Sequence, residues 1–168
     1  MKFSLENIVE KKELVETMIE LQSLQSMKVS LESIRRGEGG LDERRASMLK
    51  RVPDVGDWAK FPHEHLAMKD LAYLTAKTGH EFAILRGKHE DILFHGTAQR
   101  CTFDDALVDL LLTKRLMIYG HSHPGEEFPI PSPQDRKTLR SLGQSQSKLI
   151  SGMSGREMTF SQDEFELT

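Results

Sequence analysis

The sequence predicts an α/β protein of the α+β kind, with a mixed central β-sheet flanked by helices and an N-terminal helical arm. Two observations lead to this class. After about residue 60, short apolar runs typical of strands alternate with helical patterns, without the regular βαβ rhythm of a parallel sheet. Before residue 60, helical patterns dominate. We therefore expect an arm, residues 1–60, and a folded domain, residues 61–168.

Length and composition indicate one hydrophobic core with an appendage. The chain has 168 residues, of which 38% are hydrophobic and 29% are charged. Its net charge of -3 offers no basic surface, so neither nucleic acid nor a membrane is expected as a partner. The single Cys101 cannot form an internal disulfide, and we assign it no role. Because the charged N-terminus is unlike a secretion signal and no segment is apolar enough to span a membrane, we expect a cytoplasmic protein.

The arm begins with one long amphipathic pattern, residues 4–36, which predicts a single helix. Its apolar residues, mostly three or four positions apart, are Ile8, Leu14, Val15, Met18, Leu21, Leu24, Met27, Leu31 and Ile34. Three glycines within residues 37–40 end this helix, and a second one, residues 41–51, stops before Pro53. The pattern leaves two roles open: a helical hairpin packed on its own domain, or a helix that binds a partner or a second copy.

The first half of the domain combines one helix with a strand pair. After a loop, residues 55–65, a helical pattern runs from Leu66 to Ala76, and Gly79 is placed to end it. Two apolar runs, residues 81–87 and 91–96, lie on either side of a turn-like tripeptide. This arrangement predicts a hairpin or two adjacent strands.

The second half repeats the alternation. Residues 103–116 form a helical pattern with acids near its start and bases near its end, as the helix dipole favours. The short apolar run 117–120 predicts a buried strand. A further helix over residues 133–145 and two closing strands, residues 147–154 and 156–167, complete the domain.

The buried strand leads directly into the sequence HSHP, which has the geometry of a metal site. Successive side chains on a strand point to opposite sides, so His121 and His123 lie on the same side. Downstream, Ser132 is a helix N-cap, Pro133 takes the first helical position and Asp135 falls in the first turn. Two imidazoles and one carboxylate match the three protein ligands of catalytic zinc, whereas structural zinc usually requires cysteines. The other histidines, His63, His65, His80, His89 and His95, lack comparable spacing, and we interpret residues 63–65 as solvated.

These residues resemble the JAB/MPN domain metalloproteases, whose JAMM signature is a glutamate on a strand, then HxHP, then SxxD. The matching elements are Glu81, HSHP at residues 121–124 and SPQD at residues 132–135. The resemblance covers residues 63–168 and implies the JAB/MPN fold, which is cytidine deaminase-like. Eleven residues separate His123 from Asp135, one more than in the family's usual pattern. Glu126 and Glu127 therefore stay open as alternative third ligands.

The resemblance implies a zinc-dependent isopeptidase or peptidase. His121, His123 and Asp135 would hold Zn²⁺, and Glu81 would act as general base and then general acid. Ser132 would stabilise the oxyanion while it caps its helix. The implied substrate is an extended protein or peptide tail, such as that of a ubiquitin-like protein, with a small glycine-rich end in a narrow channel. The short chain resembles bacterial or phage-type relatives rather than larger deubiquitinases.

A second hypothesis is a non-catalytic scaffold, because many relatives keep the fold without the metal and serve in complexes. The presence of all five signature positions argues against it. A zinc deaminase has a related layout, but it requires a cysteine pair that this chain lacks.

Overall fold

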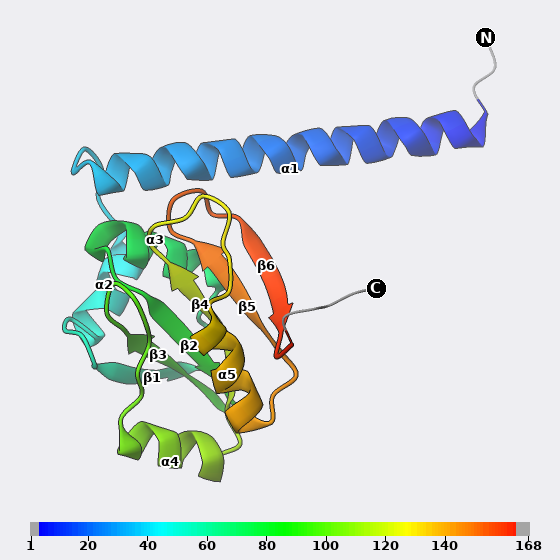
Figure 1. Cartoon of the computed structure of the whole chain (residues 1–168). Helices are drawn as coiled ribbons and strands as arrows, with labels where there is room; N and C mark the ends of the chain where they lie inside the picture. The colour runs from blue at the N-terminus through cyan, green and yellow to red at the C-terminus, as the bar shows by residue number, and fades with distance from the viewer. Residues whose placement is uncertain (1–3, 164–168) are drawn as a thin grey trace.

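The computed structural model describes residues 4–163, and these residues form one mixed six-stranded sheet with five helices, as the sequence predicts for the α+β class (Figure 1). The helices are α1 (Leu5–Arg35), α2 (Glu43–Arg51), α3 (Met68–Thr78), α4 (Asp105–Thr113) and α5 (Pro133–Leu142). The strands are β1 (Trp58–Pro62), β2 (Phe82–Arg86), β3 (Glu90–His95), β4 (Met117–His123), β5 (Gln146–Ser151) and β6 (Glu157–Ser161). The spatial order is β1-β3-β2-β4-β5-β6, in which only the β4–β5 pair is parallel.

One predicted loop is wrong in part. Within residues 55–65, Trp58–Pro62 forms the edge strand β1, paired antiparallel with β3. Only Phe61 of this strand is buried, so the segment lacks the apolar run that identifies a strand, and its pairing depends on residues about thirty positions away. The last closing strand is shorter than predicted, because β6 ends at Ser161; residues 164–167 of the prediction lie outside the described residues.

Helices cover both faces of the sheet. On one face, α2, α3 and the C-terminal part of α1 build the main core over Phe82 and Ile84 of β2. On the other face, Ala83 and Leu85 pack with α4, and α5 packs through Leu139 in a separate small cluster. The strict alternation along β2 therefore assigns each of its side chains to one of the two faces.

Only the C-terminal third of α1 belongs to the core. Met27, Leu31 and Ile34 are buried, and the Arg35 guanidinium donates to the Gly152 carbonyl at 3.0 Å. Figure 1 shows the rest of the helix extending away from the sheet. Its exposed apolar side chains, between 52% and 81% accessible, are Leu5, Ile8, Val9, Leu14, Val15, Met18, Ile19 and Leu21.

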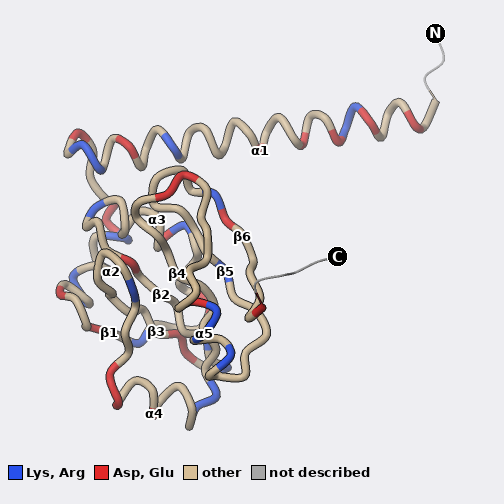
Figure 2. Tube along the Cα trace, viewed as in Figure 1, with Lys and Arg blue, Asp and Glu red and all other residues tan. Residues whose placement is uncertain are grey.

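Charge on α1 is placed towards its two ends. Figure 2 shows acidic and basic residues at both ends of the helix, separated by an uncharged stretch, residues 21–27. Within residues 4–163, no helix combines the length and the apolar character that crossing a membrane requires.

The boundary near residue 60 falls inside β1, and the second half of the arm shares the main core. Met48 of α2 and Val52 after it are 2% and 0% exposed, respectively. The arm thus contains an exposed segment, about residues 4–22, and a packed segment, about residues 23–60.

Truncation separates these two segments. Among the described residues, a chain that begins at Ser23 loses only exposed side chains, so its melting temperature should stay within about 2 °C of the full chain. A chain that begins at Phe61 loses Met27, Leu31 and Met48 from the core and should show no cooperative melting. Circular dichroism on heating measures both. Cooperative melting of the shorter chain near the full-length value would mean that the whole arm is a separable unit.

Candidate functional site

A β-bulge in β4 arranges the site residues on one face of the sheet. Ile84 of β2 pairs with Gly120, but the next residue, Leu85, pairs with Ile118, so Tyr119 is the additional residue. The bulge resets the alternation, and His121 and Ile118 both come to the α4–α5 side of the sheet. Bulges of this kind commonly redirect side chains beside active sites.

Ser122 points to the opposite face and anchors β4 there. Its hydroxyl lies 2.6 Å from the Thr75 hydroxyl of α3 and accepts a hydrogen bond from the Phe82 backbone N–H at 3.0 Å. Both Ser122 and Thr75 are at most 1% exposed, so these bonds satisfy groups that have no access to water. The two histidines on either side of Ser122 are consequently held in fixed positions.

His121, His123 and Asp135 form a close triangle. The two Nε2 atoms of the histidines lie 3.2 Å apart. Asp135 Oδ1 is 3.2 Å from His121 Nε2, and Asp135 Oδ2 is 3.3 Å from His123 Nε2. Both histidines are buried, at 7% and 8% exposure. Two imidazole nitrogens and the two oxygens of one carboxylate thus lie close together, and each of these atoms can donate a lone pair.

The start of α5 fixes the carboxylate of this triangle. Ser132 is the N-cap: its Oγ accepts from the Asp135 N–H at 3.0 Å, and Asp135 Oδ2 accepts from the Ser132 N–H at 2.9 Å. This reciprocal capping box satisfies two helix-end donors and orients the side chain. The additional loop residue before Ser132 therefore leaves Asp135 beside the histidines.

Neither alternative acid of the loop approaches the Nε2 side of the histidines. Glu126 Oε2 lies 3.5 Å from Nδ1 of His123 and accepts from the Ile130 N–H at 2.9 Å. Glu127 is paired with Lys28 of α1 at 2.5 Å. Glu126 is therefore placed to orient His123 from its far nitrogen, as outer partners of metal-bound histidines do.

Glu81 lies next to the triangle but farther from the histidines than Asp135 does. It is 4% exposed, and its Oε2 is 4.0 Å from Nε2 of His123. Glu81, His121 and His123 offer ligand atoms within 4.8 Å of one another, so this trio could also hold a metal ion. The backbone of Glu81 is fixed by hydrogen bonds with Thr97 and Gly96. Asp135 lies closer than Glu81 to both histidines.

Burial and mutual contact shift the pKa values of the site. Burial raises the pKa of the Glu81 carboxyl, even though the neighbouring histidines act in the opposite direction. Asp135 is partly buried, which alone would raise the pKa of its carboxyl, but hydrogen bonds from His121 and His123 hold that pKa far below its usual range. Burial lowers the pKa of His123, yet the contact with Asp135 and the charge of Glu81 outweigh this effect and raise it. Of the two carboxyls, Glu81 thus binds a proton more readily.

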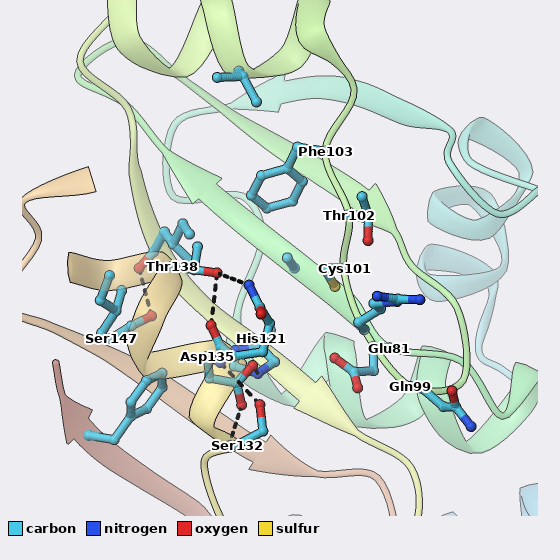
Figure 3. Close-up of a pocket in the computed structure, with 17 residues that line it drawn as sticks. Glu81, Gln99, Cys101, Thr102, Phe103, His121, Ser132, Asp135, Thr138 and Ser147 are labelled. Atoms are coloured by element: carbon cyan, nitrogen blue, oxygen red, sulfur yellow. Dashed lines mark hydrogen bonds and ion pairs between the residues drawn. The ribbon is translucent and has the colours of Figure 1, made fainter. Parts of the chain in front are cut away.

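A cavity of about 720 Å³ opens beside these residues. Figure 3 shows Phe103, Cys101 and Glu81 along one side of it and Thr138 on the opposite side, with His121 and Asp135 between them. The site therefore has space for a substrate.

Sequence analysis missed several contributors to the site. The segment of residues 99–103 forms a wall of the cavity, but it has no motif. Cys101 in that segment has its thiol pKa raised well above the usual value, by burial first and then by Glu81 and Asp135, so the thiol stays neutral. The anchoring role of Ser122 could have been inferred from its place inside HSHP, where the strand period turns it towards the opposite face.

His95 and His80 form a pair that serves the fold. His95, 2% exposed, has Nδ1 2.7 Å from the Val52 carbonyl and Nε2 2.8 Å from Nδ1 of His80. Burial lowers the pKa of His95, which keeps its ring neutral. Residues 63–65 are exposed, as the sequence predicts.

Comparison with known proteins adds no relative. No protein-family model matches the chain, and no curated protein or solved structure is significantly similar to it.

The raised pKa of Glu81 predicts that ionisation of this carboxyl lowers the free energy of unfolding of the metal-free protein as the pH rises. A carboxyl whose folded pKa lies above its unfolded value favours folding at low pH, and this contribution is lost as pH rises through the folded pKa. Glu81→Gln removes the charge. In urea unfolding with EDTA, Glu81→Gln should therefore gain stability relative to the parent as pH rises from 5 to 7.5. Glu10→Gln, on the exposed part of α1, is the control and should show the same difference at both pH values; a pH-independent effect of Glu81→Gln would contradict the prediction.

Proposed function

We propose that this protein is a zinc-dependent isopeptidase or peptidase that hydrolyses an amide bond at an extended peptide tail. The observation that carries the proposal is the triangle of His121, His123 and Asp135 with Glu81 beside it. The resemblance of HSHP, SPQD and the upstream glutamate to the JAMM signature supports it. The proposed fold is accordingly that of the JAB/MPN domains, with α1 as an addition.

The spacing of the ligand atoms is close to that of a zinc site. Ligands bonded to tetrahedral zinc at about 2.0–2.1 Å are about 3.3 Å apart, by the geometry of a tetrahedron. The two Nε2 atoms are 3.2 Å apart, and they lie 3.2 and 3.3 Å from the two different oxygens of the Asp135 carboxylate. If both imidazoles donated an N–H to the carboxylate, these two N–H groups would face each other, so protons alone satisfy the arrangement less well. A cation between the three side chains is attracted by all of them.

The proposed reaction needs an activated water, a polarised carbonyl and a group that transfers a proton. A zinc ion held in the triangle supplies a Lewis acid, which makes water a nucleophile near neutral pH and polarises the carbonyl of the scissile bond. Glu81 takes the proton from the attacking water as the new C–O bond forms. It then gives this proton to the amine nitrogen as the C–N bond breaks, so one carboxyl serves both steps.

Ser132 is placed to assist at the carbonyl oxygen. Its Oγ accepts from the Asp135 N–H, which leaves the hydroxyl proton free to donate to a substrate. Ser132 also lines the cavity together with Glu81 and His121. It would therefore stabilise negative charge as that charge develops on the oxygen.

A non-catalytic scaffold is the second candidate, favoured by the exposed apolar side chains of α1. Such a face on an extended helix suits a partner helix or a second copy. The two candidates differ in what they require of Glu81, because a scaffold has no use for a buried base beside the triangle.

The first prediction under this proposal concerns the ligands. The purified protein should bind one zinc ion per chain, as measured by elemental analysis. Asp135→Ala should weaken zinc binding much more than Glu126→Ala or Glu127→Ala, since only Asp135 approaches Nε2 of both histidines. Equal losses would reassign the third ligand. Because the histidines must be neutral to bind, and the pKa of His123, despite its burial, is raised by Asp135 and Glu81, zinc affinity should also fall as the pH drops, beginning above the ordinary histidine range.

The second prediction concerns the base. Glu81→Gln should retain the fold and the zinc, because Glu81 lies outside the triangle, while turnover of a cleavable substrate drops by roughly two to four orders of magnitude. His121→Ala is the contrasting variant and should lose zinc and turnover together. Parent-like cleavage by Glu81→Gln would show that another group is the base. A parent that binds zinc but cleaves none of the peptide and isopeptide tails offered would favour the scaffold.

A further inference from the structure

The cavity beside the site lies on the face of the sheet that α4 and α5 cover. The buried cluster under α4 contains Leu107 and Leu111, and a second, small cluster contains Leu139 of α5 and Phe160. The end of α5 also packs on the first cluster through Leu142, and the cavity is lined by residues of both clusters. On the opposite face, by contrast, one continuous core joins three helices.

Apolar and polar side chains both line this cavity away from the triangle, and the polar ones are Gln99, Arg100, Thr102, Gln134, Thr138 and Ser147. Its floor is Ala83 of β2 and Ile118 of β4, both buried. One wall is Val108 of α4 with Phe103, and Leu139 of α5 and Phe160 of β6 lie on the other side. The volume, about 720 Å³, lies within the range of pockets that hold small organic ligands.

The cavity adjoins the reacting groups directly. Ala83 is paired with His121 across the sheet and lies two residues beyond Glu81, so all three side chains lie on the same face. Glu81, His121, Ser132 and Asp135 themselves line the cavity. A group bound at the triangle therefore has this space as its immediate neighbour.

We propose that this cavity is a specificity pocket, which receives one bulky apolar side chain of the substrate next to the cleaved bond. The inference rests on the proposed function and names its substrate class: a peptide with a residue such as leucine or phenylalanine at that position. A glycine-rich end would leave the apolar walls in contact with water. The small Ala83 on the floor leaves room where a larger residue would close the space.

Binding and cleavage are measured separately to test this. The probes are acetylated pentapeptide amides, Gly-Gly-X-Gly-Gly, in which X is glycine, alanine, leucine or phenylalanine. Binding to the zinc-loaded full-length chain carrying Glu81→Gln is measured by isothermal titration calorimetry. The leucine and phenylalanine peptides should bind at least about ten-fold more tightly than the glycine peptide, because each buries an apolar side chain.

Two variants fill the cavity from opposite sides. Val108→Trp on α4 and Thr138→Phe on α5, each added to Glu81→Gln, should reduce the phenylalanine-to-glycine preference to about one. Leu112→Trp is the matched control, since Leu112 is 58% exposed on the same helix as Val108 and does not line the cavity. It should keep the full preference. Two filling variants on different helices guard against the misfolding of one.

The outcomes separate this inference from the proposed function. Three results would contradict the specificity pocket: equal affinity for all four peptides, no binding of any peptide, or a phenylalanine preference that persists in both filling variants. The same peptides are then incubated with zinc-loaded parent protein, and products are identified by mass spectrometry. Selective binding without cleavage would support the specificity pocket and contradict the peptidase proposal. Cleavage of the glycine peptide as fast as the phenylalanine peptide would support the peptidase proposal and contradict the specificity pocket.

Discussion

The β-bulge at Tyr119 is the constraint on which the site depends. Without it, strict alternation along β4 would put Ile118 on the same side as Ser122 and away from His121. With it, Ile118 and His121 share the face that carries Glu81 and the cavity, while Ser122 turns to the main core. One additional residue in a strand thus brings the apolar floor of the cavity and the polar triangle together.

The Ser122 hydroxyl links β2 and β4, the strands next to or within which Glu81 and the two histidines lie. It lies between His121 and His123 in β4 and accepts from the N–H of Phe82, the residue directly after Glu81. A shift of β4 against β2 would break this buried bond, which costs about 1–3 kcal/mol when a partner is left unsatisfied. The distance between Glu81 and the histidines is therefore fixed by a bond on the opposite face of the sheet.

The sequence predicted what depends on local pattern and missed what depends on distant contacts. The helix start at Ser132 and the shared side of His121 and His123 follow from capping chemistry and strand period, and the structure contains both. Strand β1 stayed hidden because its partner β3 is distant in sequence. The apolar spacing of α1 is regular along its length, so no local signal shows that only its last third is buried. The cavity was not predictable, because its lining comes from segments far apart in the sequence, such as Ala83, Phe103, Leu139 and Phe160.

Glu81 combines burial, which raises the pKa of its carboxyl, with a place on the wall of the cavity. The sheet face beside it carries Ala83 and Ile118, whose side chains offer a carboxylate no hydrogen bonds. A bulky apolar side chain that entered the cavity would displace water and make the surroundings of Glu81 less polar. The charged carboxylate would then be disfavoured further, and its tendency to take a proton would increase. Under the proposed function, occupation of the pocket would thus strengthen the base beside it and link the choice of substrate to the chemistry.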